Sequence, residues 1–583
     1  MTLRGSIVVI WALRVSLYAI LAFITLLEVH RIHGFFADDA FITFRYARNL
    51  ALGRGWVYNL GHPSSGATSP LYVVVLAVMY LVHPAMRDNA TLIFSVGACI
   101  GSILTMESLW YMRLYVAGSV AALFLVANPW FALMRGMESG LFVLFAACAV
   151  YCYVRDWQWP SGLALALLTL TRGEGALLAV GCGVMWMATH RKFPTEMVVA
   201  GLVPLLIWAV YAFLTLHHIL PDTLTAKVDQ GASGYWGRGL IFFKGFVSLP
   251  KIQSDRAWAV SLLAAVIVGC GAFVVDRRSA RIVLPLSWFA LGFLFMYGVV
   301  WNVPAYHWYY VTPLYVAVIL ASVGVEHMMD LAWRQRNGVL LSLAVVLVGS
   351  VVGAGIAQTR NHFIYGPYIA AATWLRQHTA PTATVAATEI GVIGWVSHRT
   401  MVDYLGLLSP RTGQALREHD LTSWLLWYEP NYWVVHSPPW VFEEASTQPW
   451  FSSAFTKVYE ARGIVIYRRY APVSNAIATY DRARTLFVGR VSACVPSMRG
   501  KMAAAVITLV RLYGMRPDLQ KAFGKGGRLQ LADLFDWAAG PGISVDAQKA
   551  TLLPYASYYR SLARLHLTNA CSVIPYPTAL RGG

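Results

Sequence analysis

Apolar residues dominate the first 357 positions of the chain and gather in runs that short polar connectors separate. A run of about 20 apolar residues is long enough to cross a bilayer as a helix. Twelve runs are candidates for membrane spans, at residues 6–27, 71–83, 91–112, 115–128, 139–154, 161–171, 175–189, 197–216, 258–275, 282–300, 308–325 and 338–357. This pattern predicts a polytopic α-helical membrane domain over residues 1–357.

Basic connectors predict the orientation of these helices. Loops rich in Lys and Arg stay in the cytoplasm, and "HRK" (190–192), "DRRSAR" (276–281) and "WRQR" (333–336) are such loops. The first run lacks a small-residue cleavage site, so we interpret it as a retained anchor with a cytoplasmic N-terminus. The loop 28–70 and the chain after 357 are then extracytoplasmic. A cytoplasmic N-terminus and an extracytoplasmic C-terminal part require an odd number of crossings. One of the twelve runs must therefore fail to cross, and we expect about 11 transmembrane helices.

The pattern changes after residue 357. The stretches "ATVAAT" (383–388), "NYWVV" (431–435) and "GIVIY" (463–467) are typical of short strands, and residues 366–378 are typical of a helix. From about residue 480 the chain is mostly helical in character, with Gly- and Pro-rich breaks. We expect an extracytoplasmic α/β domain at 358–479 and a mostly helical part at 480–583.

Composition and charge support this interpretation. Of 583 residues, 57% are hydrophobic and 13% are charged, whereas soluble domains carry roughly a quarter charged residues. Residues 358–583 hold 23 Lys and Arg against 13 Asp and Glu, a surplus of 10 within a net charge of +18. Either anionic lipid headgroups or an anionic substrate would match such a surface. Nucleic acid is not an expected partner of an extracytoplasmic domain.

Cysteine positions agree with export of the C-terminal part. Two cysteines, Cys494 and Cys571, lie there without a third nearby, which predicts a disulfide in an oxidising compartment. The others are in apolar runs, where a thiol is a small apolar filler: Cys99, Cys148, Cys152, Cys182 and Cys270.

Two adjacent aspartates follow the first apolar run, in "FFADDAF" (35–41). Asp38 can cap an amphipathic helix from about Ala40 to Leu52, since its carboxylate would accept from amides of the first turn. A cap needs only one carboxylate. Asp39 is then left at the outer interface beside arginines, where a general base and a phosphate site would be neighbours.

Several stretches carry a resemblance to a known family. "ADDAFITFRYARNLALGRGWVYNLG" (37–61) with "SGATSPL" (65–71) resembles the first extracytoplasmic loop of GT-C glycosyltransferases, which use polyprenyl-phosphate sugars. The branch of terminal β-(1→2)-arabinofuranosyltransferases of actinobacterial arabinan has elements similar to "RGMESGL" (135–141), "TRGEG" (171–175), "ILPDTLTAK" (219–227), "EIGVIGW" (389–395) and "VDYLGL" (402–407). The chain departs from that pattern at Ser64 and Ser65, where an acidic residue is expected, and at Gly173, where the family has proline.

The resemblance implies a substrate and a reaction. The donor would be decaprenyl-phosphoryl-arabinofuranose, and the acceptor the arabinan of arabinogalactan or lipoarabinomannan. No cofactor is required, a divalent cation is permitted, and "GKGGR" (524–528) lacks the spacing of a P-loop. We expect a monomer in the plasma membrane. Both donor and product would be β-linked, which means net retention. A single displacement would invert the linkage, whereas a double displacement through two carboxylates would retain it.

The resemblance and the topology together select the candidate site. Asp39 is the expected general base, with Asp38 second or orienting it. Candidates for the donor phosphate are Arg45, Lys227 and His218, although a solvated loop explains the last two equally well. Glu138 and Arg172 are expected to pair at membrane depth. The cluster "WNVPAYHWYY" (301–310), with His307, Trp308 and Tyr309, either stacks on sugar rings or forms an interfacial aromatic belt.

Three other functions remain open from the sequence. A related transferase could use another sugar or acceptor. A transporter of lipid-linked sugars would also place charges in the bundle, but paired halves with interrupted helices are absent from the sequence pattern. A non-catalytic carbohydrate-binding scaffold could use the C-terminal part alone and would not need the aspartates.

Overall fold

The computed structural model describes residues 3–31, 36–128, 134–219, 221–252, 279–336 and 366–480, with a few isolated positions between 266 and 349. The chain divides into two compact units, Met1–Asp420 and Leu421–Gly583. The domain limits expected at 357/358 and 479/480 stay predictions.

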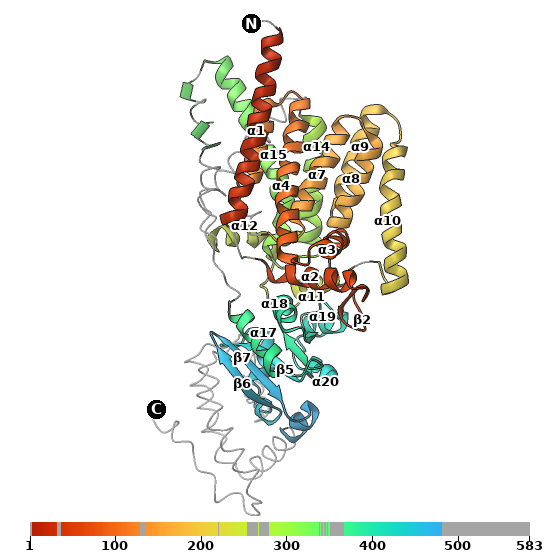
Figure 1. Cartoon of the computed structure of the whole chain (residues 1–583), viewed down its shortest axis with the longest axis vertical. Coiled ribbons are helices and arrows are strands. Elements are labelled where there is room, and N and C mark those ends of the chain that lie inside the picture. The colour runs from red at the N-terminus through yellow and green to blue at the C-terminus, as the bar shows by residue number, and fades with distance from the viewer. Residues whose placement is uncertain are drawn as a thin grey trace, which may run out of the picture. The chain divides into compact units, whose positions relative to one another are not determined.

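The first unit is mainly helical (Figure 1). Its described helices up to residue 336 are α1 (Leu3–Arg31), α2 (Asp38–Ala51), α3 (Pro70–Val82), α4 (Met86–Tyr111), α5 (Tyr115–Val126), α7 (Ser139–Val154), α8 (Gln158–Thr171), α9 (Gly175–His190), α10 (Thr195–Leu216), α11 (Asp222–Ala232), α12 (Ile241–Ile252), α14 (Ala280–Phe295), the π-helix η1 (Met296–Val300), the 3-10 helix η2 (His307–Tyr310) and α15 (Val311–Arg334). Ten of the twelve predicted apolar runs coincide with these helices. The runs at 258–275 and 338–357 lie almost wholly outside the described residues.

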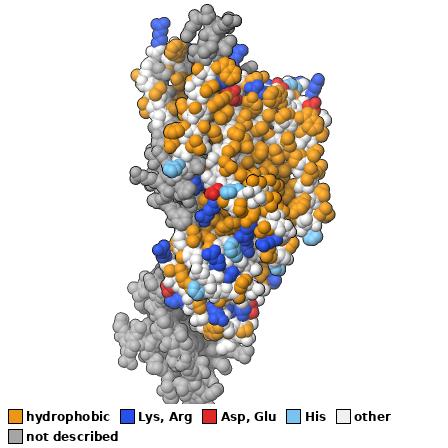
Figure 2. All heavy atoms as spheres, in the orientation of Figure 1, with side chains coloured by type: hydrophobic (Ala, Val, Ile, Leu, Met, Phe, Trp, Pro, Cys, Tyr) orange, Lys and Arg blue, Asp and Glu red, His pale blue; other side chains and the backbone are white. Residues whose placement is uncertain are grey.

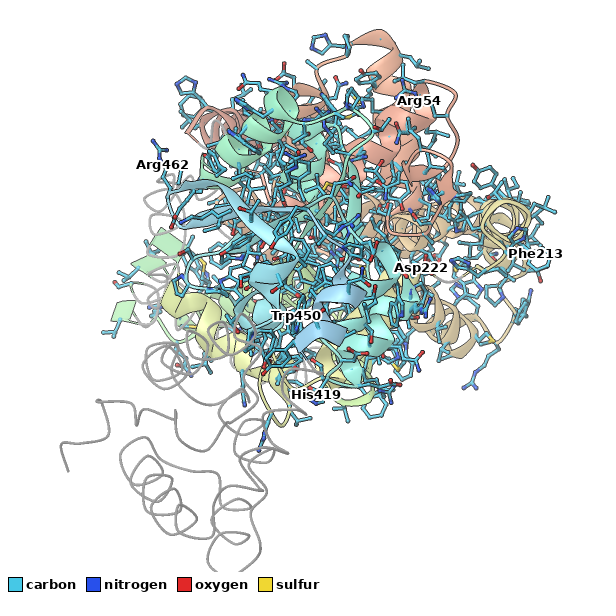
Figure 3. The ribbon with its side chains drawn as sticks, turned by 90° about the horizontal axis from the view of Figure 1, so that it is seen from below. Arg54, Phe213, Asp222, His419, Trp450 and Arg462 are labelled. Carbon is cyan, nitrogen blue, oxygen red and sulfur yellow. The ribbon has the colours of Figure 1, made fainter. Side chains whose placement is uncertain are left out.

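Helix length and surface character show a multi-pass membrane protein. Four described helical segments are long and apolar enough to cross a bilayer: Met86–Tyr111, Thr195–Leu216, Ala280–Val300 and His307–Arg334. Apolar side chains cover the outer face of the bundle (Figure 2). On α10, Ile207 and Phe213 are exposed, and Phe213 points away from the neighbouring helices (Figure 3). Such side chains are stable in contact with lipid, not with water. The total of about 11 helices stays a prediction.

Helix α7 lies in the core of the bundle. The Phe142 ring stacks on Phe289 with 6.2 Å between centroids, and it meets Tyr315 edge to face at the same separation. Helices α4 and α7 approach closely at Gly97 and Gly140, where a Cβ atom on either residue would collide with the backbone of the other helix. Small residues permit such close helix packing in membranes.

Basic connectors gather at one end of this bundle. The Asp156 carboxylate pairs with Arg281 and lies 3.4 Å from His190 Nε2, so the "DRRSAR" and "HRK" segments are neighbours. The turn between α9 and α10 lies at the opposite end of the bundle from α2 (Figure 1). This arrangement agrees with the predicted separation of cytoplasmic connectors from the first loop.

The other end of the first unit combines the first loop with residues 366–420. The loop holds α2 and the short pair β1 (Val57–Asn59) and β2 (His62–Pro63). The later segment contains α17 (Gly366–His378), β3 (Thr384–Ala387), α18 (Ile390–Ser397), β4 (Thr400–Asp403) and α19 (Pro410–Arg417). Strands β3 and β4 are parallel, with Val385 opposite Met401. The predicted helix at 366–378 and the strand within 383–388 are confirmed.

The second unit contains an antiparallel sheet in its described part. Its elements are α20 (Ser423–Tyr428), β5 (Tyr432–His436), η3 (Val441–Thr447), η4 (Phe451–Ser453), β6 (Phe455–Ala461) and β7 (Ile464–Arg469). Strand β7 pairs with both β5 and β6, and the Trp433 side chain is fully buried against Trp424 and Phe451. The strands predicted in "NYWVV" and "GIVIY" are confirmed.

The predicted disulfide Cys494–Cys571 lies outside the described residues, as does the helical part expected after residue 480. Cys99, Cys148, Cys152 and Cys182 are free thiols.

Candidate functional site

Asp38 does not cap its own helix, contrary to the interpretation from the sequence. The cap position of α2 is Ala37, which makes no side-chain capping bond, and Asp38 is already the first helical residue. Its carboxylate points instead to the start of α18. Oδ2 accepts from the backbone N–H of Gly391 at 3.0 Å and Oδ1 from that of Val392 at 2.7 Å. Asp38 therefore satisfies free amides of another helix.

Glu389 adds a second carboxyl group at this point. It precedes α18, and its side chain hydrogen-bonds Asp38. Burial raises the pKa of Asp38 to about 7, and burial together with the neighbouring Asp38 raises the pKa of Glu389 well above its usual range. Like charges so close disfavour double ionisation, so the pair retains a proton at neutral pH.

Asp39 has a different environment from Asp38. It is half-buried, and among the described residues its carboxylate makes no hydrogen bond or ion pair. Burial raises its pKa, and the positive charge of Lys227 opposes that rise. A carboxylate with free lone pairs and a raised pKa is suited to accept a proton.

Lys227 lies on α11 and faces the aspartates. Its side chain is buried, and Nζ is 4.0 Å from the ring centroid of Tyr306 and 5.7 Å from that of Trp308. Within the described ranges, Nζ has no hydrogen-bond or ion-pair partner. Burial lowers its pKa, while nearby carboxylates, of which Asp39 acts most strongly, raise it. Asp39 and Lys227 thus interact through space with their polar atoms still available to a ligand.

An aromatic wall adjoins Lys227. The rings of Tyr306 and Trp308 stack with 4.7 Å between centroids and 6° between planes. The Tyr306 hydroxyl donates to Gln230 Oε1 at 3.0 Å, and Gln230 Nε2 donates to the carbonyl of Leu405 at 3.0 Å. These contacts join the wall to α11 and to the segment after β4. Stacked aromatic faces of this kind bind sugar rings or cations.

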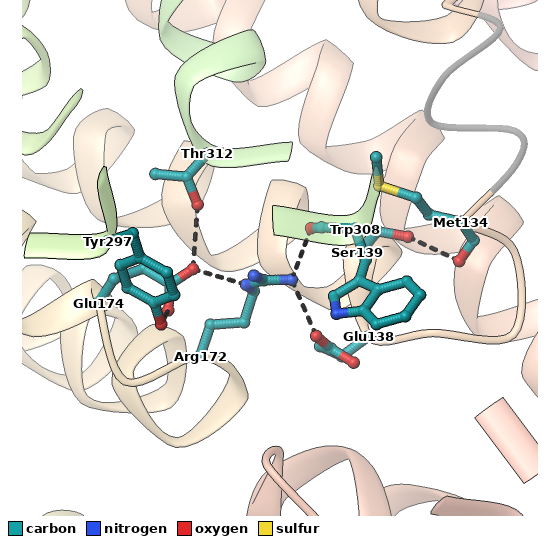
Figure 4. A network of polar contacts seen from close by, with 8 residues as sticks. All are labelled: Met134, Glu138, Ser139, Arg172, Glu174, Tyr297, Trp308 and Thr312. Atoms are coloured by element: carbon teal, nitrogen blue, oxygen red, sulfur yellow. Dashed lines mark hydrogen bonds and ion pairs between the residues drawn. The ribbon is translucent and has the colours of Figure 1, made fainter. Parts of the chain in front are cut away.

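Arg172 is the centre of a buried ion network (Figure 4). Its Nη1 is 3.0 Å from Glu138 Oε1 and its Nε is 2.6 Å from Glu174 Oε1. Nη1 also donates to the carbonyl of Trp308 at 3.1 Å, while Thr312 and Tyr297 donate to Glu174. The expected pairing of Glu138 with Arg172 is present. The network contacts the aromatic wall through the hydrogen bond from Arg172 to the backbone carbonyl of Trp308.

Two of the other aromatic candidates differ in their surroundings. The Tyr309 ring lies 5.9 Å from the Arg172 guanidinium and packs against Tyr297. The His307 ring meets Trp308 edge to face at 4.9 Å. Tyr309 therefore adjoins the ion network of Arg172, and His307 adjoins the aromatic wall. Their expected contact with substrate stays a prediction.

Arg45 has structural contacts in place of the expected phosphate contact. Its guanidinium is buried and donates to the carbonyl oxygens of Tyr58 (2.9 Å), Gly394 (3.0 Å) and Arg399 (2.8 Å), and to Asn59 Oδ1 (3.3 Å). None of its contacts in the described chain involves Asp39 or Lys227. Because these acceptors occupy its donor groups, Arg45 joins the first loop to α18 and is not placed to hold a phosphate.

His218 is also separate from the Asp39–Lys227 pair. Its Nε2 lies 3.1 Å from Asp222 Oδ1, and Asp222 Oδ2 accepts from the N–H of Ser65 at 2.9 Å. The described contacts of His218 do not extend to Lys227. Asp222 therefore provides a carboxylate beside Ser65, the position where the family resemblance leads one to expect an acidic side chain in the loop itself.

Several residues of the site were not selected from the sequence. They are Glu389, Asp403, Tyr306, Glu174 and Gln230. Glu389 lies in "EIGVIGW" and Asp403 in "VDYLGL", two stretches that carried the family resemblance. Each is the single acidic residue of an otherwise mostly apolar stretch, and this was the sequence signal that could have identified it as a site residue. Asp403 accepts from the N–H groups of Leu405 and Leu408 and so shapes the turn after β4.

The acidic residues do not form a metal site within the described ranges. No group of three or more His, Cys, Asp or Glu side chains there could hold a metal ion. Two oxygens of Asp38 are already engaged by backbone N–H groups. The divalent cation that the resemblance permits stays a prediction, since one free carboxylate such as Asp39 together with a substrate phosphate can also bind Mg²⁺.

Comparison with solved structures defines the fold. The structure is similar to ArnT from Cupriavidus metallidurans bound to undecaprenyl phosphate, with a TM-score of 0.51 and 14% identity over 81% of this chain and 99% of that chain. It is also similar to the Archaeoglobus fulgidus oligosaccharyltransferase tethered with an acceptor peptide, with a TM-score of 0.49 and 12% identity over 79% of this chain and 74% of that chain. The likeness to ArnT shows that this chain shares the fold of that protein.

Sequence comparisons add a domain match. Residues 355–488 match a family described as a domain of unknown function (DUF8728). A search of curated protein sequences gave no match.

Proposed function

We propose that this protein is a membrane glycosyltransferase that transfers arabinofuranose from decaprenyl-phosphoryl-arabinofuranose to the arabinan of arabinogalactan or lipoarabinomannan. The broader form of the proposal is transfer of a sugar from a polyprenyl phosphate. The observation that carries it is the pair formed by Asp39 and Lys227. A carboxylate and an ammonium group of opposite charge, neither with a hydrogen-bond partner among the described residues, lie beside stacked aromatic rings.

The pair supplies what this reaction needs. Asp39 accepts the proton of the acceptor hydroxyl in the step that bonds its oxygen to the anomeric carbon. With a β-linked donor, one displacement of this kind gives an α linkage, and a β-linked product requires a second displacement. The bond between the anomeric carbon and the phosphate oxygen breaks, and its electron pair remains on the phosphate. Lys227 neutralises the charge of the departing lipid phosphate. Tyr306 and Trp308 offer apolar faces to a sugar ring next to Lys227.

The fold supports a lipid-linked donor. ArnT, which has the same fold, was crystallised with undecaprenyl phosphate. A polyprenyl chain needs contact with the bilayer, and α2 and α11 lie at the end of the helical bundle, next to its apolar belt (Figures 1 and 2). We infer that this end faces the periplasmic side of the plasma membrane, since the basic connectors gather at the other end.

Transfer by the purified protein tests the proposal. Synthetic decaprenyl-phosphoryl-arabinofuranose and a short arabinan are incubated with the parent, with Asp39→Asn and with Asp88→Asn, an exposed aspartate at the start of α4. Loss of a general base lowers the rate by about 10² or more, so Asp39→Asn should lose transfer while Asp88→Asn keeps it. Product linkage is read by NMR.

Each of the other outcomes rejects one part of the proposed function. If the parent transfers no arabinose but transfers another sugar from a polyprenyl phosphate, the arabinofuranose assignment is wrong. If the parent only moves the lipid-linked sugar across vesicle membranes, the protein is a transporter. Equal transfer by parent and Asp39→Asn would place the base elsewhere.

A further inference from the structure

Three carboxyl groups from two distant parts of the chain meet at the start of α2. Asp38 and Asp39 are consecutive, and Glu389 comes from the segment between β3 and α18. The mechanism above uses Asp39 and leaves Asp38 and Glu389 without a role. Their geometry points to one.

We propose that Asp38 and Glu389 share one proton and act as a positioning pair for Asp39, so that the segment containing α18 contributes a residue to the active site. The inference rests on the proposed function, in which Asp39 is the general base. It makes Asp38 a support for the base instead of a second base, and it adds Glu389 to the site.

Hydrogen-bond direction assigns the proton within the pair. Both oxygens of Asp38 accept from backbone N–H groups, at 3.0 Å from Gly391 and 2.7 Å from Val392. Such donors favour the ionised form of Asp38. Glu389 also bonds to Asp38, so Glu389 must be the donor and must carry the proton. Asp38 with its oxygens so engaged cannot turn toward a substrate.

Close packing holds this pair in place. The Tyr58 hydroxyl donates to the carbonyl of Ile390 at 2.6 Å, and Arg45 Nη1 donates to the carbonyl of Gly394 at 3.0 Å. At Gly391 an added Cβ would collide with the backbone carbonyl and the carboxylate of Asp38. The first turn of α18 is therefore held against α2 and β1, and Glu389 at its start keeps a constant position relative to Asp39.

The charges around the pair explain why one proton must remain. Ionisable groups on neighbouring elements act on the pair: Asp39 on α2, Tyr58 on β1, Lys227 on α11 and Tyr306 before η2. Lys227 is the cation among them; Arg45 on α2 also packs against α18, but backbone carbonyl oxygens occupy its guanidinium. With the proton retained, the pair carries one negative charge. Without it, a further negative charge would face Asp39 and the donor phosphate, which weakens phosphate binding beside Lys227.

We expect transfer activity to decline at alkaline pH, where the Asp38–Glu389 pair loses its shared proton. Glu389→Gln keeps a hydrogen-bond donor toward Asp38 but has no proton to lose. In Glu389→Gln the alkaline decline should disappear, and transfer at neutral pH should exceed that of Glu389→Ala. Glu389→Ala removes the donor, and transfer should fall by about 10-fold or more, as for loss of a charged hydrogen bond. Glu418→Gln, an exposed carboxylate on the same segment, should behave as the parent.

A readout without catalysis separates this inference from the proposed function. Infrared difference spectra of the purified proteins at neutral pH report the carbonyl stretch of protonated carboxyl groups. The parent and Glu418→Gln should show a band that Glu389→Gln lacks. Persistence of that band in Glu389→Gln would overturn the shared proton, whether or not the parent transfers sugar.

Two kinetic results would also overturn the inference. One is an alkaline decline in Glu389→Gln identical to that of the parent. The other is an equal loss of transfer in Glu389→Gln and Glu389→Ala, with thermal unfolding showing that both variants are folded. That result would indicate that the site requires the carboxyl group of Glu389 itself and not merely a hydrogen-bond donor at this position. If the parent transfers no sugar but the band behaves as expected, the proposed function fails and the shared proton stands.

Discussion

The Asp38 carboxylate accepts a 2.7 Å hydrogen bond from the backbone N–H of Val392, which follows it by 354 positions in the chain. This bond joins α2, in the loop after α1, to α18, which follows α17. The neighbouring Asp39 makes no such bond in the described structure. Two adjacent residues of the same type therefore have separate tasks, one in holding the structure and one in the proposed chemistry.

Stability should distinguish the two aspartates. Asp38→Asn keeps one acceptor oxygen and turns an amide N–H group toward a backbone donor, so the unfolding free energy should fall by about 1–3 kcal/mol. Asp39→Asn removes a half-buried charge without breaking a described hydrogen bond and should change stability little. Thermal unfolding of both variants in the same detergent at one pH measures the difference. Greater loss in Asp39→Asn than in Asp38→Asn would contradict these assignments.

Gly391 should tolerate no side chain. Gly391→Ala would force α18 away from Asp38 because the new Cβ has no room, and overpacking of this kind costs about 1–3 kcal/mol. Gly183→Ala on α9 is the matched control, since nothing lies within 4 Å of the Cβ that it would add. Limited proteolysis followed by mass spectrometry should show earlier cleavage near residues 390–400 in Gly391→Ala alone. Equal protection of both variants would argue against a tight α2–α18 contact.

Arg172 should be essential for folding. Arg172→Met leaves Glu138 and Glu174 buried without a cation, and removal of one partner from a buried ion pair costs about 3–5 kcal/mol. The double variant Arg172→Met with Glu174→Gln should recover part of this loss, because it removes one of the two unpaired charges. Arg54→Met, at an exposed arginine of the first loop, is the control. Size-exclusion profiles and thermal unfolding give the measurement, and a stable Arg172→Met protein would refute the prediction.

Lys227 should act on the donor. Lys227→Met keeps the aliphatic stem beside Tyr306 but removes the charge, so kcat/KM for the lipid-linked donor should fall by about 10- to 100-fold, the loss of roughly 1.5–3 kcal/mol expected for a charged hydrogen bond. Lys244→Met removes an exposed lysine on α12 and serves as the control. Binding of decaprenyl phosphate alone should weaken in parallel. Unchanged binding by Lys227→Met would remove Lys227 from the phosphate site.

Folding stability should decrease as pH rises toward neutrality. Burial raises the pKa values of the Asp38–Glu389 pair, that of Asp38 to about 7 and that of Glu389 well above its usual range, and it also raises the pKa of Asp39. The folded state therefore holds these protons more tightly than the unfolded chain does. The resulting stability is complete below the ordinary carboxyl range near pH 4 and is lost as pH rises through about 7. Unfolding midpoints between about pH 4.5 and 8 should fall steadily in the parent, and a rise over this window would contradict the assignment.

Much of the membrane part was predictable because its signals are local. A long apolar run and a basic connector are read from consecutive residues, and ten of the twelve runs are helices in the described structure. The strands in "ATVAAT", "NYWVV" and "GIVIY" were predictable for the same reason. The pairing of Glu138 with Arg172 followed from the cost of an isolated charge at membrane depth.

The use of each polar side chain at the site was decided by tertiary structure. The sequence by itself determined the acidic pair, the amphipathic helix after it and the family resemblance. It did not determine that Arg45 would bond to Gly394, that Asp38 would serve α18, or that Glu389 would join the aspartates. Such partners come together only when elements far apart in the chain pack against each other. The free energy of a buried charge depends on those partners, not on its neighbours in sequence.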